Sequence, residues 1–185
     1  MRLRIAILCT LLILSLGANF SLGKVALADS PHFKKGGTPT CTISGSTSSN
    51  SVTCTGSLAG LGNQDVQLNL SVSGFAVYQC QNNGGNIAPG QNKVLVGPAT
   101  SSTSIPASAI KNGNLTFTTN PATLTAEPTV SAAVAGCPNN NWTGVNPTLT
   151  VTDITLVIQQ PPGTTIFTCT ASNKNGLSSP VTLTC

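Results

Sequence analysis

Apolar and polar residues alternate along most of the chain beyond residue 40. The clearest stretch is 65–80, where apolar side chains recur at every second position: Val66, Leu68, Leu70 and Val72, then Ala76, Tyr78 and Cys80 in the same phase. A period of two is typical of a strand that buries one face. The stretch therefore predicts one long strand or two collinear strands.

A second alternating stretch covers residues 122–134. Its apolar positions are Leu124, Ala126, Val130, Ala132 and Val134, with Thr, Glu and Ser between them. We expect a half-buried strand here. Because Pro128 has no backbone N–H to donate, it predicts a sheet edge or a bulge within this strand.

Further strands are expected near 93–97, 114–119, 148–159, 164–171 and 180–184, with short runs around Cys41 and Cys54. The apolar phase switches across Asp153, which predicts a bulge there. About nine strands and no helical periodicity predict an all-β, antiparallel sandwich of immunoglobulin-like architecture, with a barrel as the alternative. Neither the cysteine spacing nor Trp142 fits a true immunoglobulin domain.

The N-terminus predicts export. Two arginines within residues 1–4 precede an apolar run at 5–16, and Ala-Leu-Ala at 26–28 follows. These features are typical of a secretory signal peptide at 1–28, so the mature protein is expected outside the cell. A membrane span is not expected, since polar residues interrupt the run before the roughly 20 apolar residues that a spanning helix needs.

The mature chain divides into two parts. Residues 29–38 hold two lysines, two glycines and no alternation, and predict a flexible N-terminal arm. Residues 39–185 then form a single β-sandwich domain.

Charge is scarce once residues 1–28 are removed. The rest of the chain has five lysines, four carboxylates and no arginine. Nucleic-acid binding draws on clustered lysine and arginine, so that function is not expected.

Six cysteines remain after residue 28: Cys41, Cys54, Cys80, Cys137, Cys169 and Cys185. Six allow 15 pairings, and an exported chain favours disulfides over a metal site, for which no C-x-x-C motif is present. If Ser44 lies opposite Ser51, Cys41 lies opposite Cys54 on one face of a hairpin.

The other two pairs rest on weaker arguments. Cys80 and Cys137 each end a strand-like run and open a loop rich in Asn, which predicts a bond between them. Cys169 and Cys185 are then left for each other. A two-residue turn at 175–176 would place Cys169 opposite Thr182, so this pair needs a longer or bulged loop.

The residues that could carry catalysis are few. His32 is the single histidine and falls in the expected arm, while Asp65, Glu127 and Asp153 are widely spaced. Catalysis by a nucleophile or by paired carboxylates needs such groups to be positioned together. We therefore expect a protein that is not an enzyme, with no cofactor and no metal.

Binding has more support than catalysis. Tyr78 and Trp142 lie close to Cys80 and Cys137, so a bond between these cysteines would bring the two aromatic rings near one another. The bond would also tether the loops at 82–92 and 139–143, which hold Asn86 and Asn141, beside Trp142. Aromatic rings beside amides can bind sugars or peptides. The alternative is that Tyr78 belongs to the core and Trp142 covers the end of the sandwich.

Several turn-rich strings resemble a group of small, uncharacterised secreted proteins of filamentous and related bacteria. The strings are GLGN at 60–63, GGN at 84–86, APGQNK at 88–93, IKNG at 110–113 and CPNNNWT at 137–143. The resemblance covers about residues 40–160 and implies export and a β-rich domain, but no activity.

Three function classes stay open. The first is a secreted, non-enzymatic extracellular or cell-surface module, structural or adhesive, whose partner is a cell-surface glycan or protein. The second is an extracellular binding protein for a small apolar ligand or a carbohydrate. The third, a secreted hydrolase, has least support from the residues.

Overall fold

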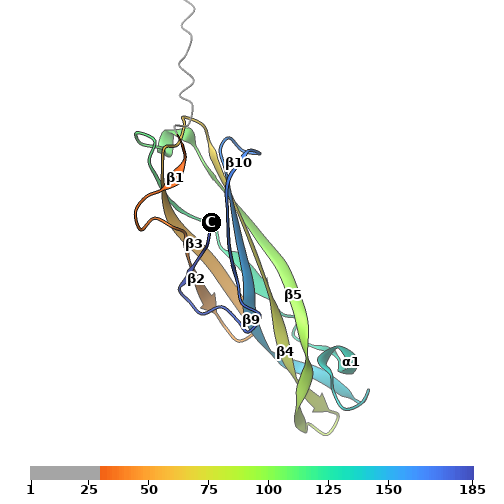
Figure 1. Ribbon diagram of the computed structural model, residues 1–185. Helices are drawn as coiled ribbons and strands as arrows, with labels where there is room; N and C mark the ends of the chain where they lie inside the picture. The colour runs from red at the N-terminus through yellow and green to blue at the C-terminus, as the bar shows by residue number, and fades with distance from the viewer. Residues whose placement is uncertain (1–29) are drawn as a thin grey trace, which may run out of the picture.

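The computed structural model describes residues 30–185, and the predicted signal peptide and Asp29 lie outside them. The described chain is almost entirely strand, arranged in two antiparallel sheets (Figure 1). The elements are β1 (His32–Phe33), β2 (Thr40–Gly45), β3 (Ser49–Ala59), β4 (Val66–Asn82), β5 (Ile87–Ile105), η1 (Ala107–Ala109), β6 (Leu115–Thr118), β7 (Ala122–Thr125), β8 (Val130–Ser131), α1 (Ala132–Ala135), β9 (Trp142–Gln159), β10 (Thr165–Ser172) and β11 (Val181–Thr182).

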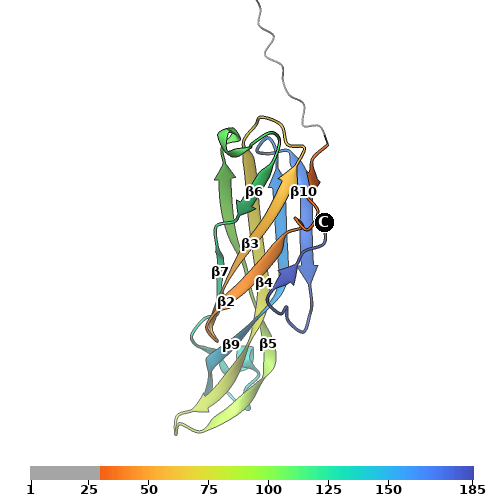
Figure 2. The same cartoon turned by 90° about the vertical axis from the view of Figure 1, so that its left-hand side faces the viewer.

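The first sheet is built around β3. One edge of β3 pairs with β1 and β2, the other with β6 and β7, and β11 adds to the outer edge of β2 (Figure 2). Alternate residues of β3 such as Val52, Cys54 and Leu58 are fully buried. The strands therefore form because each has one apolar face to bury.

The second sheet has the order β10-β9-β4-β5, with β8 paired to the start of β9. Its three longest strands have 17, 19 and 18 residues. At about 3.3 Å per residue they span roughly 56–63 Å. They run well past the end of the first sheet, down to α1 (Figure 1).

These lengths divide the molecule into two regions. We call the part where both sheets are present the body. We call the rest the finger: Val77–Asn82 of β4, Ile87–Lys93 of β5, Trp142–Thr148 of β9, with β8 and α1. The two regions meet where Lys93, Val77 and Thr148 pair across the three strands.

Aliphatic side chains fill the body between its two sheets. The largest that are less than 2% exposed include Leu58, Leu68, Leu70, Leu124, Ile154, Leu156, Ile158 and Leu183. The buried polar groups have partners: the side-chain amide of Gln160 accepts from the N–H of Gly62 and donates to the carbonyls of Gly62 and Gln64. Such pairing removes most of the cost of burying an amide.

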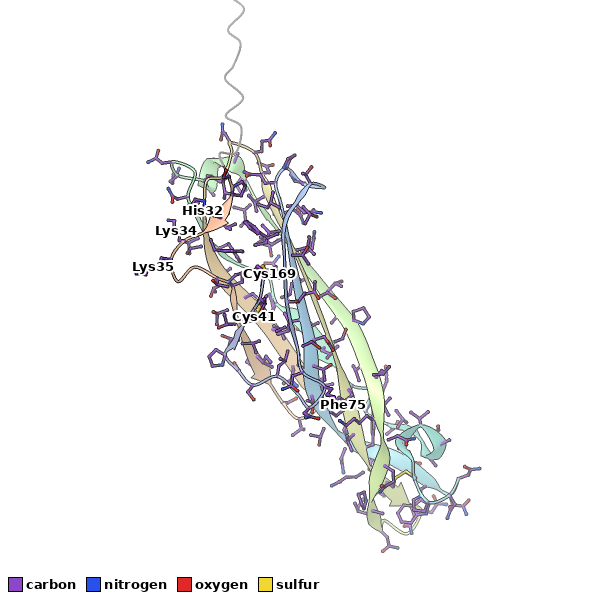
Figure 3. The ribbon with its side chains drawn as sticks, viewed as in Figure 1. His32, Lys34, Lys35, Cys41, Phe75 and Cys169 are labelled. Carbon is purple, nitrogen blue, oxygen red and sulfur yellow. A yellow bond between two sulfur atoms is a disulfide. The ribbon has the colours of Figure 1, made fainter. Side chains whose placement is uncertain are left out.

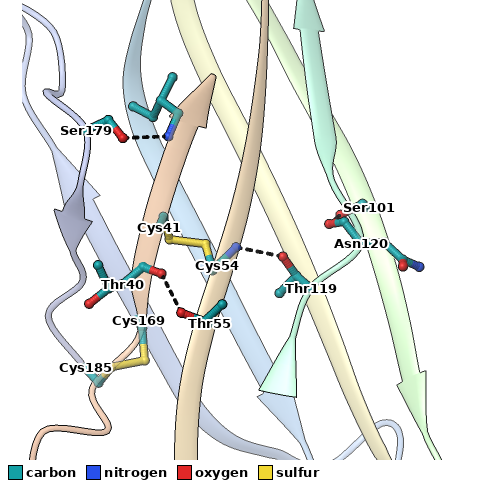
Figure 4. Close-up of a disulfide and its surroundings, with 11 residues drawn as sticks. Thr40, Cys41, Cys54, Thr55, Ser101, Thr119, Asn120, Cys169, Ser179 and Cys185 are labelled. Atoms are coloured by element: carbon teal, nitrogen blue, oxygen red, sulfur yellow. Dashed lines mark hydrogen bonds between the residues drawn. A yellow bond between two sulfur atoms is a disulfide. The ribbon is translucent and has the colours of Figure 1, made fainter. Parts of the chain in front are cut away.

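The C-terminal segment ties the two sheets together. Val181 pairs with Cys41 in the first sheet, while Thr184 bridges to Thr170 in the second. The disulfide Cys169–Cys185 fixes this segment to β10 (Figure 4). The segment reaches both sheets because eight residues, not two, separate β10 from β11, which is the longer loop that the sequence required.

All three predicted disulfides are present, Cys41–Cys54, Cys80–Cys137 and Cys169–Cys185. The hairpin register predicted for the first bond is confirmed, because Ser44 pairs with Ser51 and Cys41 with Cys54. Next to this bond, the Thr119 hydroxyl accepts from the Cys54 N–H at 3.0 Å (Figure 4).

The predicted bulge at Asp153 is confirmed, since the pairing of β9 with β4 skips Thr152 between Asp153 and Val151. The prediction of one strand over 122–134 is wrong. β7 ends at Thr125, and Ala132–Ala135 form a helical turn with the Ser131 hydroxyl accepting from the Val134 N–H. Gly136 ends this turn in the left-handed region, at φ 71°, where a glycine is favoured.

The described chain has eleven strands where about nine were expected. The short strands β1 and β8 account for the difference. The expected N-terminal arm is attached to the body from His32 onward. β1 pairs with the end of β3, and the Lys34 N–H donates to the Ser57 carbonyl at 3.0 Å. Phe33 also packs on Phe167, with ring centroids 4.5 Å apart.

Candidate functional site

The finger ends in two loops that are rich in asparagine. The first is the turn between β4 and β5. The Asn82 N–H donates to the Asn86 carbonyl at 3.1 Å, and the Asn82 side-chain oxygen accepts from the Asn86 N–H at 2.9 Å. Gly85 adopts φ 79°, a conformation open to glycine at little cost. The turn is thus held closed by its own hydrogen bonds.

The second loop runs from Cys137 into β9. The Asn139 side-chain oxygen accepts from the Asn141 N–H at 2.9 Å, and the Asn139 carbonyl accepts from the Trp142 N–H at 3.2 Å. Such side-chain to backbone bonds favour a defined turn. This loop, like the first, has its conformation fixed from within.

The fold brings the two loops together at one end, which we call the tip (residues 82–86 and 137–142). Asn82 pairs with Trp142 where β4 meets β9, and the bond Cys80–Cys137 joins the strand to the second loop. A third tie comes from Asn92 of β5, whose amide donates to the carbonyls of Ala133 and Val134 in α1. The proximity predicted from the cysteines is therefore present.

Three of the four predicted binding residues lie at the tip. Asn86 and Asn141 are exposed, and within residues 30–185 their side-chain amides make no hydrogen bond to the protein. Trp142 is half-buried and packs against the core, and it pairs with Asn82 where β9 lies beside β4. The tip thus combines free amide groups with a partly exposed indole side chain.

Tyr78 does not belong to this surface. Its side chain is 2% exposed, and its hydroxyl donates to the Glu127 carbonyl at 2.9 Å. Burial, and then the charge of Glu127, raise the pKa of Tyr78 above its ordinary value, so the hydroxyl stays a donor. Tyr78 links β4 to the chain after β7, which is the alternative that the sequence left open.

The titratable residues lie apart from the tip. His32 is at the other end of the molecule, beside Lys34 and Lys35 (Figure 3), and its Nδ1 lies 2.8 Å from the Ser30 carbonyl. Hydrogen bonds from the hydroxyls of Ser172 and Thr152 lower the pKa of Asp153. Among residues 30–185 there is no cluster of three His, Cys, Asp or Glu side chains that could hold a metal.

Comparison with protein-family models, curated proteins and solved structures finds no match to this chain. The resemblance to a group of secreted bacterial proteins therefore stays a prediction. In the described part of the chain, no helix is both long and apolar enough to cross a membrane.

Sequence reasoning missed the contribution of α1 and Asn92 to the tip. A signal for α1 was present, because Ser131 and Gly136 stand at the positions where a helix is commonly capped at its two ends. The contact between Asn92 and α1 joins residues 41 positions apart, and no local pattern indicates it.

Proposed function

We propose that this protein is a secreted, non-enzymatic extracellular module, structural or adhesive, whose tip contacts a partner. In this proposal the body is an immunoglobulin-like β-sandwich that supports the finger. Export is proposed from the N-terminal signal pattern, and three disulfides are consistent with an oxidising compartment.

The observation that carries the proposal is the convergence of two fixed asparagine-rich loops beside Trp142. Loops that are already ordered lose little conformational freedom when a partner binds. Recognition surfaces also often combine aromatic anchors with amides that hydrogen-bond to the partner. The tip thus has both the order and the chemistry of a contact surface.

The partner we favour is uncharged. Residues 82–86 and 137–142 contain no charged side chain, so they offer hydrogen bonds and an aromatic surface but no ion pairs. A neutral cell-surface glycan or the polar backbone of a protein fits such a surface. Binding should then depend little on salt, since screening acts on charge pairs.

The test is retention of the exported protein on insoluble cell-wall polysaccharide, with Trp142→Ala as the variant. Leu95→Ala is a matched control, because Leu95 is a large hydrophobic side chain, 88% exposed, that lies outside the tip. We expect Trp142→Ala to reduce retention at least tenfold, equal to about 1.4 kcal/mol, and Leu95→Ala to leave it unchanged.

Two results would contradict the proposal. If Trp142→Ala unfolds the protein in a thermal melt, the ring serves the core and not a contact surface. If retention is the same for both variants and the parent, the tip is not the binding site. Turnover of ester, peptide or glycoside substrates by the parent protein would remove the non-enzymatic assignment.

A further inference from the structure

A second candidate site lies where the finger leaves the body. A groove of about 550 Å³ is lined there by the turn after β2, the chain after β7, and β4 and β9. Its residues include Thr47, Ser48, Thr125, Pro128, Gln79 and Asn146. The volume is in the range of pockets that hold small ligands. The groove combines residues from four separate segments, so it exists only in the folded protein.

A bulge in β9 shapes this groove. Val77 pairs with Thr148 and Gln79 with Val145, so two residues of β9, Asn146 and Pro147, lie opposite the single residue Tyr78 of β4. Asn146 adopts φ 50°, an uncommon conformation for a residue other than glycine. Bulges of this kind redirect a side chain and occur next to functional sites. Here the bulge directs the Asn146 amide across to Gln79.

The two amides are joined by one hydrogen bond. The Asn146 Nδ2 donates to the Gln79 Oε1 at 3.0 Å. Within the described chain, the Gln79 Nε2 and the Asn146 Oδ1 make no hydrogen bond to the protein, so the joined amides keep one free donor group and one free acceptor. A free donor and a free acceptor on two hydrogen-bonded amides suit a pair of neighbouring hydroxyl groups, one of which accepts while the other donates.

The rest of the groove is also uncharged. Threonine and serine hydroxyls come from Thr47, Ser48 and Thr148. The exposed ring of Pro128 adds apolar surface, and the largely buried Pro147 also lines the groove. None of the residues that line the groove carries a charge. A sugar ring presents hydroxyls at its rim and C–H groups on its faces, and the groove offers partners for both.

We propose that the groove at the base of the finger binds a neutral saccharide, with the amides of Gln79 and Asn146 holding adjacent sugar hydroxyls. The site is separate from the tip, because the Gln79–Val145 pair lies three pairs along β4 and β9 from Asn82–Trp142. It therefore does not depend on the function proposed for the tip. The rival occupant is a segment of neutral peptide.

The test is an NMR titration of the ¹⁵N-labelled exported protein with cellobiose and with N,N′-diacetylchitobiose. We expect the side-chain amide signals of Gln79 and Asn146 to shift. Asn146→Gly removes the amide while glycine keeps the backbone conformation at φ 50°. This variant should bind at least tenfold more weakly.

The matched control is Asn112→Gly. Asn112 has nearly the same backbone angle, φ 51°, in the exposed turn before β6, and it lies outside the groove. We expect this variant to bind the sugars in the groove as the parent does. The Gln79 and Asn146 side-chain signals report on the groove and not on the tip. A failure of the tip proposal would thus leave this result unchanged, and the two proposals can fail separately.

Three outcomes would overturn the groove site. The first is no shift with either sugar at about 50 mM, well above a millimolar dissociation constant. The second is equal binding by Asn146→Gly and the parent. The third is that a neutral tripeptide, and neither sugar, shifts the Gln79 and Asn146 signals.

Discussion

The body and the finger share three strands but are held together in different ways. In the body, two sheets bury large aliphatic side chains such as Leu70 and Leu156 against each other. In the finger there is a single sheet, which β8 extends at the edge of β9 and against which the four residues of α1 pack. There the backbones approach closely: a Cβ on Gly90 would lie 2.7 Å from the Ala135 carbonyl oxygen, and one on Gly144 2.7 Å from the Ala135 Cβ.

This difference explains why the finger needs its disulfide. Stabilisation by apolar burial scales with the area removed from water, and the thin finger removes little. The bond Cys80–Cys137 and the amide of Asn92 supply the missing constraint. An exposed, polar tip can therefore be rigid without a large core beneath it.

The largest expected effect separates the two regions. Replacing Cys80 and Cys137 by serine opens a loop of 57 residues and should cost about 4 kcal/mol in the chain-entropy account. We expect hydrogen exchange to accelerate in the finger amides while the amides of β3 stay protected. Serine at Cys41 and Cys54 is the control, and its loss of about 3 kcal/mol should appear in the body. Uniform acceleration in both variants would remove the distinction.

Truncation of the core should act in the body alone. Leu70→Ala removes a side chain that is 1% exposed, and we expect a loss of about 3 kcal/mol in the free energy of unfolding by urea. Val145→Ala in the finger, where the side chain is half-buried, should cost less than about 1 kcal/mol. Equal losses would mean that the finger shares the core of the body.

Tyr78→Phe tests the hydrogen bond at the junction of the two regions. The variant keeps the buried ring and removes the hydroxyl that donates to the Glu127 carbonyl. We expect a loss of about 1 kcal/mol in thermal or urea unfolding, with no change in retention on polysaccharide. A loss of retention with an unchanged melting temperature would return Tyr78 to the binding surface.

The smallest effect concerns acid stability of the body. Hydrogen bonds from Ser172 and Thr152 lower the pKa of Asp153 below its unfolded value. A lowered pKa contributes stability that is present above the unfolded pKa and is lost as the pH falls through the folded pKa. Unfolding followed from neutral to acid pH should therefore show a flatter decline for Asp153→Asn than for the parent. An identical decline would show that these bonds do not favour the ionised form.

The same contrast decides what could be predicted from the sequence. In strands of the body, such as β4 over Val66–Val72, apolar and polar residues alternate because one face is buried. The same alternation identified Cys41 and Cys54 as partners. The apolar residues at 130, 132 and 134 were misleading, because a short run of Ala and Val is compatible with a strand and with a helical turn.

Most of the finger could not be predicted in detail. Its register shifts at 90–92 of β5 and at 146–147 of β9, where these strands have more residues than the part of β4 opposite them. The alternation of apolar residues does not show which strand lies opposite such a bulge. The tip was predicted because cysteines flank both loops. The groove at Gln79 and Asn146 was not, because its residues come from four segments that only the tertiary fold brings together.

The central claim is that the finger carries recognition while the body supports it. Hydrogen exchange measured by mass spectrometry, with the protein free and mixed with cell-wall polysaccharide, tests this claim most directly. We predict slower exchange on binding for the backbone amides of residues 82–86 and 137–142, with no change in β2 and β3. Slower exchange confined to β2 and β3, with the tip unaffected, would contradict the claim.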